Sequence, residues 1–576
     1  MAESKSKGLA KSPHGTLQGF STKGLAGDLS AGLTKSIDSV TGGMANAVLA
    51  GVNPVFGLYT VLAATPIGAL FTSSVYMNID STGAIAATAG SMLILYPEEE
   101  RPLALAVLTL LVGVFMLAAG LLKLGFLTRF ISNAVLRGFL TGIGVNIILG
   151  QLGDLTGYSS EYSNKVVKAI DTLLHLNQID LQIFLVGIVT IVLIVGLDRV
   201  RYINKISLLI ALVVASALVP LLNLTTVPLV SSLGAMPEAL PRPVLPDPAF
   251  IPGLIAPAFA LTIIALAQSA GISQAYTNPD GKYPNPSRDF TGQGAANLAG
   301  ALVQGLPAGG SLGGTAMLVK GGAQSRWANI LTGLISAILI LLFGAAIGKI
   351  ALSALAGLLM VVGFQTIKFR EINQIARTSA RARWLMIATF AATLIVPLQW
   401  AIFFGVAASF VVFAYRESES TTIVEVASNE AGVPIEQPAP KVLPSNKVTL
   451  LNAYGSLFFA GARNLEEDLP QADETQHAVV ILSLRGHTEL GSTFIGVLER
   501  YARALQAHGN TLMLVSVNPA VYEQLKDTEC LKVLGEKNVF VADQPGAGAR
   551  EAYQQAQQFV QMTVNLARDS APTDAA

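Results

Sequence analysis

The chain has 576 residues, of which 52% are hydrophobic and only 13% are charged. This composition is too apolar for an ordinary soluble protein, and the formal net charge of zero gives no support for nucleic-acid binding. The single cysteine, Cys530, excludes an internal disulfide framework and a cysteine-based metal cluster.

Apolar runs fill most of residues 25–415, whereas residues 420–576 are more polar and hold about half of the acidic side chains. Since about 20 apolar residues span a bilayer as a helix, these runs predict a polytopic helical membrane protein with fourteen segments, three of them too short to span alone. The segments are expected at 28–51, 54–73, 82–96, 102–122, 131–152, 181–197, 206–222, 251–276, 290–304, 311–320, 328–348, 350–366, 383–397 and 399–415.

Beyond the segments, alternating strand-like and helical runs predict a small α/β domain with a βαβ rhythm. The expected organisation is a disordered basic tail at 1–24, a transmembrane domain at 25–416 (repeat one 25–222, repeat two 250–416), a linker at 417–447, the α/β domain at 448–565 and a disordered tail at 566–576.

Lysine and arginine collect in every second loop of this scheme, which places those loops and both termini in the cytoplasm. We therefore expect a multi-pass protein of the cell membrane. Because seven segments precede the proline-rich 236–252 stretch and seven follow it, the second half is inverted relative to the first. Inverted repeats with broken helices are typical of transporters whose site lies between the repeats.

The stretch Gly305-Leu-Pro-Ala-Gly-Gly-Ser-Leu-Gly-Gly-Thr315 predicts a break in the membrane followed by a new helix. Ser311 stands where an N-cap would, ahead of an apolar run. The matching stretch in the first repeat is Asp80-Ser-Thr-Gly-Ala84. The two half-helices are expected to face each other with their N-termini, whose free N–H groups and positive dipole ends suit a small anion.

Several stretches together resemble the SulP anion-transporter family, the bacterial relatives of the animal solute-carrier-26 transporters. They are Ala31-Gly-Leu-Thr34, Ala50-Gly-Val-Asn-Pro-Val-Phe-Gly-Leu-Tyr59, Gln293-Gly-Ala-Ala-Asn297, Gly305-Leu-Pro307 and Thr315. Residues 446–565 resemble the family's STAS domain, with Gly455-Ser-Leu-Phe-Phe459 and Val479-Val-Ile-Leu-Ser483 as landmarks. The resemblance implies fourteen spans in a 7+7 inverted repeat, a core moving against a gate, anion uptake or exchange, and homodimers held partly through STAS.

The resemblance also places the substrate site. The residues it implies for substrate binding are Thr41, Thr82, Gly83, Ala84, Gln268, Gly310, Ser311 and Leu312. The chain departs from the family at four of its usual residues: Thr41-Gly42 replace a proline in segment 1, Ala84 a proline in segment 3, Gln268 a coupling acid, and Gly314 an arginine. Backbone dipoles are therefore expected to hold the anion. Gln268 either fills a polar gap or donates to the substrate.

Lys35 and Asp38 lie inside the first predicted segment and Asp80 opens the third, where charge is costly and faces a partner or a wet cavity. Lys35 and Asp38 are three residues apart and share a helix face. Either Lys35 snorkels to the inner surface and pairs with Asp38, or Asp38 contributes to ion coupling. Asp80 is either an N-cap or a cation ligand. Lys35, Asp38 and Asp80 are thus the ion-coupling candidates.

The function expected from these features is secondary active transport of a small inorganic anion, sulfate or bicarbonate, by alternating access. An uncoupled channel or exchanger, a nucleobase transporter of similar fold and a membrane-anchored regulator acting through STAS are the alternatives. No arrangement suggests catalysis, a metal site or a cofactor, apart from a coupling Na⁺ or H⁺. The expected partners are the anion, the lipid bilayer and a second copy of the chain, with no nucleic acid.

Overall fold

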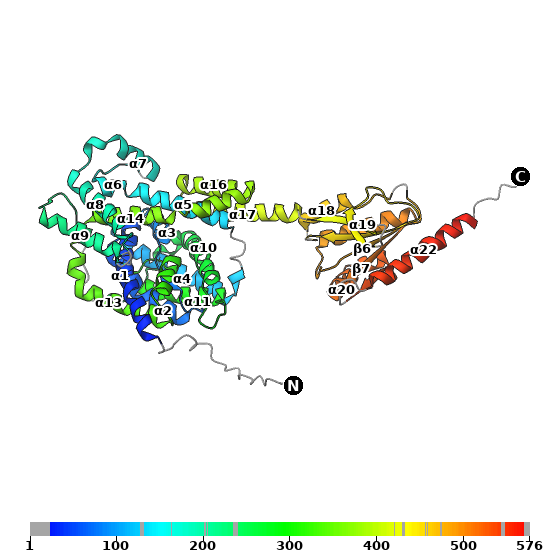
Figure 1. The fold of residues 1–576 in the computed structure, drawn as a ribbon, viewed down its shortest axis with the longest axis horizontal. Coiled ribbons are helices and arrows are strands. Elements are labelled where there is room, and N and C mark those ends of the chain that lie inside the picture. Colours follow the sequence, from blue (N-terminus) through cyan, green and yellow to red (C-terminus); the bar gives the residue numbers. More distant parts are fainter. Residues whose placement is uncertain are drawn as a thin grey trace, which may run out of the picture. The chain divides into compact units, whose positions relative to one another are not determined.

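The chain folds into two units, which divide it into Met1–Ser409 and Phe410–Ala576 (Figure 1). The computed structural model describes residues 24–126, 132–162, 164–200, 203, 206–233, 240–419, 421–428, 433–455, 457, 459–472, 475–542 and 548–569. The tail expected before residue 24 and the last residues, 570–576, lie outside the described ranges.

The first unit is helical. Its helices are α1 (Leu25–Leu49), α2 (Pro54–Phe71), α3 (Gly83–Leu93), α4 (Arg101–Leu121), α5 (Asn133–Gly150), α6 (Leu152–Thr156), α7 (Lys165–Leu174), α8 (Leu181–Leu197), α9 (Ser207–Leu221), α10 (Ile251–Ala275), α11 (Pro286–Leu302), α12 (Leu312–Lys320), α13 (Trp327–Ile347), α14 (Leu352–Thr366), α15 (Phe369–Thr378), α16 (Ala380–Ile395) and the first part of α17 (Leu398–Glu419), which crosses the boundary at Ser409. Among the described residues, seven helices are long and apolar enough to cross a membrane.

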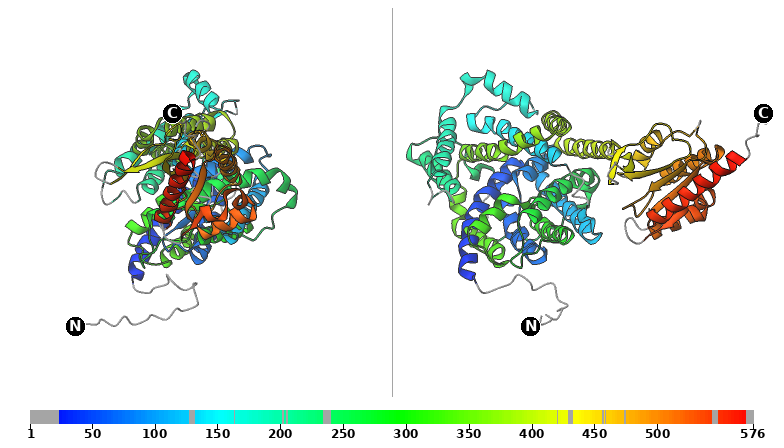
Figure 2. Two further views of the ribbon diagram at one scale, coloured as in Figure 1. Left: turned by 90° about the vertical axis from the view of Figure 1, so that its right-hand side faces the viewer. Right: turned by 45° about the vertical axis from the view of Figure 1, so that its right-hand side comes forward.

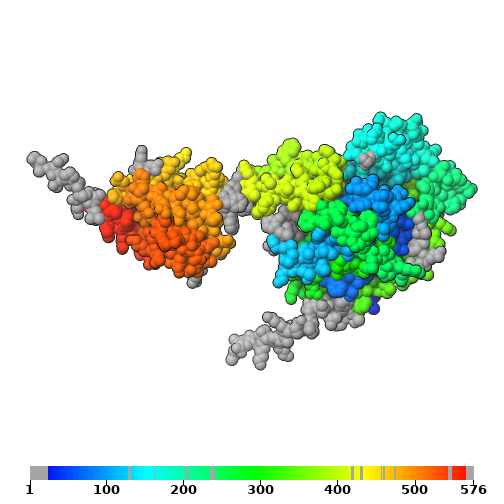
Figure 3. Space-filling model, turned by 180° about the vertical axis from the view of Figure 1, so that it is seen from behind, coloured from blue at the N-terminus to red at the C-terminus, as the bar shows by residue number. Residues whose placement is uncertain are grey.

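Each of the fourteen apolar segments expected from the sequence corresponds to one helix of this set. Helices α6, α7 and α15 were not expected, because they are short and lie in what the sequence presents as loops. We call the first unit the membrane unit. In Figure 3 the segment that contains α6 to α8, coloured cyan to turquoise, forms a lobe at the edge of this unit.

Small residues allow the helices of the membrane unit to approach closely. Helix α1 packs against α2 and α13 (Figure 1). At the first crossing, a Cβ atom added to Gly57 would lie 1.8 Å from the carbonyl oxygen of Gly43. Helix α11 meets α4 in the same way, since a Cβ on Gly294 would lie 2.6 Å from the backbone nitrogen of Leu117. Such glycine contacts are typical of membrane helices, which gain from close backbone approach rather than from the hydrophobic effect.

Two short strands lie side by side inside the membrane unit. Strand β1 (Asn78–Asp80) leads into α3, and β2 (Gly309–Ser311) leads into α12. They pair antiparallel, with Ile79 opposite Gly310. The pairing satisfies backbone groups that a broken helix would leave exposed at membrane depth. Both strands end at a helix start, so the starts of α3 and α12 lie at opposite ends of a ladder that is only three residues long, and the pairing keeps them near each other.

The second unit carries a six-stranded sheet in the order β4-β3-β5-β6-β7-β8. Its elements are β3 (Thr422–Ser428), β4 (Pro434–Pro438), β5 (Val448–Tyr454), α18 (Phe459–Asp468), β6 (Val479–Ser483), α19 (Ser492–Ala507), β7 (Thr511–Val517), α20 (Pro519–Asp527), α21 (Cys530–Leu534), β8 (Val539–Val541) and α22 (Ala549–Asp569). Strands β5 to β8 are parallel, as the βαβ rhythm predicted. Helix α22 packs along β5, β6 and β7, and Figure 2 shows it in red.

Two boundaries expected in this part of the chain were wrong. The stretch 417–447 is not a linker throughout, because β3 and β4 within it pair with each other and β3 pairs with β5. Residues 566–569, which were expected in the C-terminal tail, belong to α22, which continues to Asp569. In both places regular backbone hydrogen bonding, of a sheet or of a helix, extends into a stretch whose residues are mostly polar.

Candidate functional site

The starts of the two half-helices are capped by hydroxyl side chains. Thr82 is the N-cap of α3 and accepts a hydrogen bond from the Ile85 N–H at 3.4 Å. Ser311 is the N-cap of α12 and accepts one from the Gly314 N–H at 3.1 Å. The helix starts predicted from the glycine-rich break and its counterpart are therefore confirmed. The remaining first-turn N–H groups stay available to a ligand, as at any helix N-terminus.

A cavity of about 470 Å³ lies at these two helix starts. It is lined by residues of α1, the ends of β1 and β2, and the helices α3, α9, α12 and α14. We call it the central cavity. Gly42 and Gly313 border it, and a Cβ atom added to either would meet no heavy atom within 4 Å. The cavity is therefore open on the faces that α1 and the first turn of α12 present to it.

The central cavity brings together five of the eight residues implied for substrate binding. They are Thr41, Thr82, Gly83, Ser311 and Leu312. Of these, Thr41 uses its hydroxyl within α1, since Oγ1 donates to the carbonyl oxygens of Ile37 and Asp38 at 3.1 and 3.0 Å. The backbone of Gly83 and Leu312 and the hydroxyls of Thr82 and Ser311 are thus the polar groups of the half-helix starts that reach the cavity.

The other three residues do not line the central cavity. Ala84 is buried behind the first turn of α3. Gly310 lies within β2, and its N–H donates to Oε1 of Gln293 at 3.1 Å, so this N–H is already used. Gln268 is held by Thr82, whose Oγ1 donates to Gln268 Oε1 at 3.2 Å. Its Nε2 is buried and has no partner among the described residues.

The three ion-coupling candidates form one buried cluster at the edge of the central cavity. Lys35 Nζ lies 2.8 Å from Asp38 Oδ2 and 3.3 Å from Asp80 Oδ2. Ser39 Oγ donates to the same Asp80 oxygen at 2.9 Å. Lys35 is only 3% exposed, so it pairs with Asp38 without snorkelling to the surface. The alternative of Asp80 as a helix N-cap is wrong, because Thr82 holds that position.

The cluster also fills the space beside Gly314. A Cβ atom on Gly314 would lie 2.8 Å from Cε of Lys35 and 2.3 Å from Oδ1 of Asn78. Position 314 therefore accepts only glycine as long as Lys35 keeps this conformation. The arginine that the resemblance implies at 314 is replaced by an ammonium group that reaches the first turn of α12 from α1.

The charges of the cluster do not cancel. Lys35 carries one positive charge and the carboxylates of Asp38 and Asp80 carry two negative charges, which leaves a net charge of minus one when all are ionised. An anion beside this cluster is favoured only when a cation or a proton offsets that charge. The Ser81 hydroxyl is buried at the cavity wall without a partner among the described residues.

Several polar residues of the site were not predicted from the sequence. Asn46 holds the carbonyl of Ser81 through its Nδ2 at 2.7 Å. Asn78 Nδ2 donates to Asn329 at 3.0 Å. These contacts join residues 35 and 251 positions apart, so no local spacing could have indicated them. Among the described residues, no group of three or more His, Cys, Asp or Glu is placed to hold a metal ion.

Comparison with known proteins identifies a family model, a domain model and individual relatives that agree with one another. The Sulfate permease family matches residues 25–389, and the STAS domain matches residues 439–541. The "Putative sulfate transporter YvdB" of Bacillus subtilis is 26% identical over 530 residues, which cover 91% of this chain and 98% of that protein.

Two solved structures show the same fold. The murine Solute Carrier 26 family member A9 anion transporter, in its inward-facing state, aligns with a TM-score of 0.81 and 19% identity over 94% of this chain and 92% of that chain. The transmembrane domain of the cyanobacterial bicarbonate transporter BicA aligns with a TM-score of 0.55 and 19% identity, over 68% of this chain and 98% of that domain. The chain therefore belongs to the Sulfate permease family of membrane transporters and carries a STAS domain behind its transmembrane fold.

Proposed function

We propose that this protein carries a small inorganic anion, sulfate or bicarbonate, across the bacterial inner membrane by secondary active transport with alternating access. The observation that carries the proposal is the central cavity, into which the starts of α3 and α12 both open. Two positive dipole ends that converge on one cavity hold an anion without a fixed side-chain charge in contact with it. The names of the Bacillus subtilis relative and of BicA support sulfate and bicarbonate as the first candidates.

The charged cluster supports coupling to a cation. With its net charge of minus one, the cluster opposes the entry of an anion unless Na⁺ or H⁺ enters with it. In this proposal Asp38 and Asp80 receive the cation, while Lys35 keeps the two carboxylates in place. Both termini are cytoplasmic and the active form is a homodimer, held partly through the STAS domain.

Flux in proteoliposomes tests the proposal. Purified full-length protein is reconstituted, and uptake of radiolabelled sulfate and bicarbonate is measured with and without inward gradients of Na⁺ and H⁺. We expect accumulation of one of the two anions above its equilibrium level, driven by one of the two gradients. Uptake that only equilibrates the anion, together with a large anion current, would instead identify an uncoupled channel or exchanger.

Removing the Ser311 hydroxyl is expected to weaken anion binding at the start of α12. Ser311→Ala deletes the acceptor for the Gly314 N–H, which costs about 1 kcal/mol of stability, and removes one donor that reaches the central cavity. Since a hydrogen bond to a charged group contributes about 1.5–3 kcal/mol, KM for the transported anion should rise roughly tenfold or more.

Ser311→Thr is the matched control for this variant, because it keeps the hydroxyl and the N-cap. It should transport with a KM close to that of the unmodified protein. The hydroxyl has no role in binding if Ser311→Ala retains the original KM; the backbone N–H groups would then hold the anion alone.

A further inference from the structure

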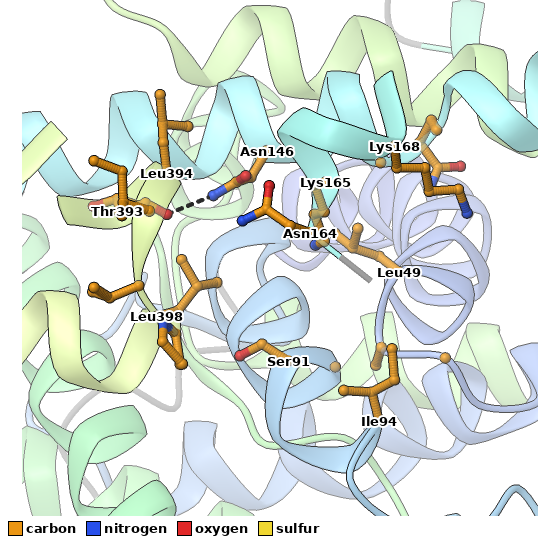
Figure 4. A pocket seen from close by; sticks show the side chains of 18 of the residues that line it. Leu49, Ser91, Ile94, Asn146, Asn164, Lys165, Lys168, Thr393, Leu394 and Leu398 are labelled. Carbon is orange, nitrogen blue, oxygen red and sulfur yellow. Dashed lines mark hydrogen bonds between the residues drawn. The ribbon is translucent and has the colours of Figure 1, made fainter. Parts of the chain in front are cut away.

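A second cavity opens at the opposite end of α3 from the central cavity. Its volume is about 540 Å³, and we call it the outer pocket. It lies among the C-terminal ends of α1, α3, α5 and α16, the start of α17, and α7 (Figure 4). Since the predicted topology places the start of α1 in the cytoplasm, the end of α1 and this pocket face the outer side of the membrane.

The lining of the outer pocket has an unbalanced charge. It contains three cations, Arg101, Lys165 and Lys168, and no aspartate or glutamate. The central cavity differs, because Lys35 there is accompanied by aspartates. The carboxylates of Glu98 and Asp154 line a neighbouring cavity of about 440 Å³, which shares Arg101 with the outer pocket. A concave surface with charges of one sign concentrates small ions of the opposite sign.

Cations near helix C-termini often serve only to balance the carbonyl dipoles, and Arg101 does serve in this way. Its Nε donates to the carbonyl oxygen of Tyr96 at 3.2 Å, and its Nη1 donates to that of Gly51 at 3.3 Å. Lys165 and Lys168 do not balance a helix dipole in this way, because neither makes a hydrogen bond or an ion pair with a residue that the structure describes.

Both lysine side chains lie over glycines of the neighbouring helices instead. A Cβ on Gly150 of α5 would lie 3.9 Å from Nζ of Lys165, and a Cβ on Gly153 of α6 would lie 3.5 Å from Nζ of Lys168. Figure 4 shows both side chains on α7, with Asn164 beside them and Ser91 of α3 across the pocket. The glycines thus allow two ammonium groups to rest close to the helix surface. The carboxylate of Asp154, which lines the neighbouring cavity and not the outer pocket, interacts electrostatically with Lys168.

We propose that the outer pocket is a second anion site, in which Lys165 and Lys168 bind a small inorganic oxyanion or halide at the outer face before it reaches the central cavity. The two sites are separated by α3, whose 11 residues span about 16 Å. The outer pocket therefore raises the concentration of the anion on one side of the transport path. The inference takes only the class of ligand from the proposed function.

Protection of the lysines from chemical modification tests the site without relying on transport. Burial and the neighbouring Lys168 lower the pKa of Lys165 to about 8, so at pH 8 a large share of its amine is uncharged and reactive. The full-length protein is treated with an amine-acetylating reagent in sodium gluconate, and sulfate, bicarbonate or chloride replaces gluconate at constant ionic strength. Mass spectrometry then measures acetylation at each lysine.

Lys349 is the reference residue, since it is exposed at the end of α13, on the same predicted face, and does not line the pocket. We expect at least one of the three anions to slow acetylation of Lys165 and Lys168 several-fold and to leave Lys349 unchanged. If acetylation of Lys165 and Lys168 is as fast in sulfate, bicarbonate and chloride as in gluconate, the proposal is overturned.

The double variant Lys165→Gln/Lys168→Gln connects the site to transport. In bacterial cells that express the full chain, the KM for external anion should rise about tenfold, because steering by a charged cleft changes capture by about that factor or more. The same variant in inverted vesicles should keep its KM from the cytoplasmic side. Lys349→Gln should change neither value.

The failures of the two proposals can be told apart. If the double variant keeps the external KM while transport continues, the outer site is wrong and the transport function stands. If anions protect the lysines but no flux is found, the outer site stands and the proposed function is wrong.

Discussion

Replacing Lys35 by methionine is expected to lower the stability of the folded protein by about 3–5 kcal/mol, because it removes one partner of a buried charge cluster. The side chain of Lys35 is almost fully buried and lies within 3.3 Å of both Asp38 and Asp80. Without it, two carboxylates remain close together at membrane depth. Thermal unfolding of the purified variant in detergent should show a lower Tm, and its uptake of labelled anion should be lost.

A second substitution distinguishes charge from packing. Methionine preserves most of the volume of lysine, so the added change Asp80→Asn in the Lys35→Met background should recover much of the Tm by removing one uncompensated charge. Lys320→Met, at the exposed end of α12, is the control for loss of a lysine and should unfold like the unmodified protein. A Lys35→Met variant with unchanged Tm would show that the cluster is not held by Lys35.

Local sequence pattern was sufficient to predict the fourteen apolar helices of the membrane unit and both half-helix starts, but not the short helices α6, α7 and α15. At Ser311, a hydroxyl residue between two glycines and an apolar run predicts an N-cap because the chemistry is confined to one turn. At the start of α3 the sequence offered Asp80 as the cap, whereas the structure has Thr82 there. The contact between Lys35 and Asp38 was equally accessible, since residues three apart share a helix face.

The rest of the site depends on contacts that the sequence does not encode locally. Asp80 meets Lys35 across 45 positions, and its own neighbourhood suggested a cap instead. The pairing of β1 with β2 involves three residues on each side, too few to form a recognisable alternation. The N–H of Gly310 in β2 donates to Oε1 of Gln293, 17 positions away, and not to a ligand in the cavity. Strands β3 and β4 were not predicted, because prolines and polar residues lie in and around them.

Filling the central cavity at Gly313 is expected to reduce anion transport strongly while the protein stays folded. Gly313 lies in the first turn of α12, and a Cβ there meets no heavy atom within 4 Å. Gly313→Val therefore adds a side chain without a clash, and valine has a somewhat higher helix propensity than glycine. The added carbons occupy the space in front of the Leu312 and Gly313 N–H groups.

Crowding of a well-fitted site should weaken the free energy of anion binding by about 1–3 kcal/mol, which corresponds to a roughly 5- to 150-fold loss of anion affinity. Uptake of labelled sulfate and bicarbonate should fall accordingly, with a Tm close to that of the unmodified protein. Gly196→Val is the matched control, because Gly196 of α8 also has open space at its Cβ position but does not line the central cavity. If Gly313→Val transports as well as Gly196→Val, the anion does not pass the start of α12. An equal loss in both variants would point to a general cost of valine in these helices.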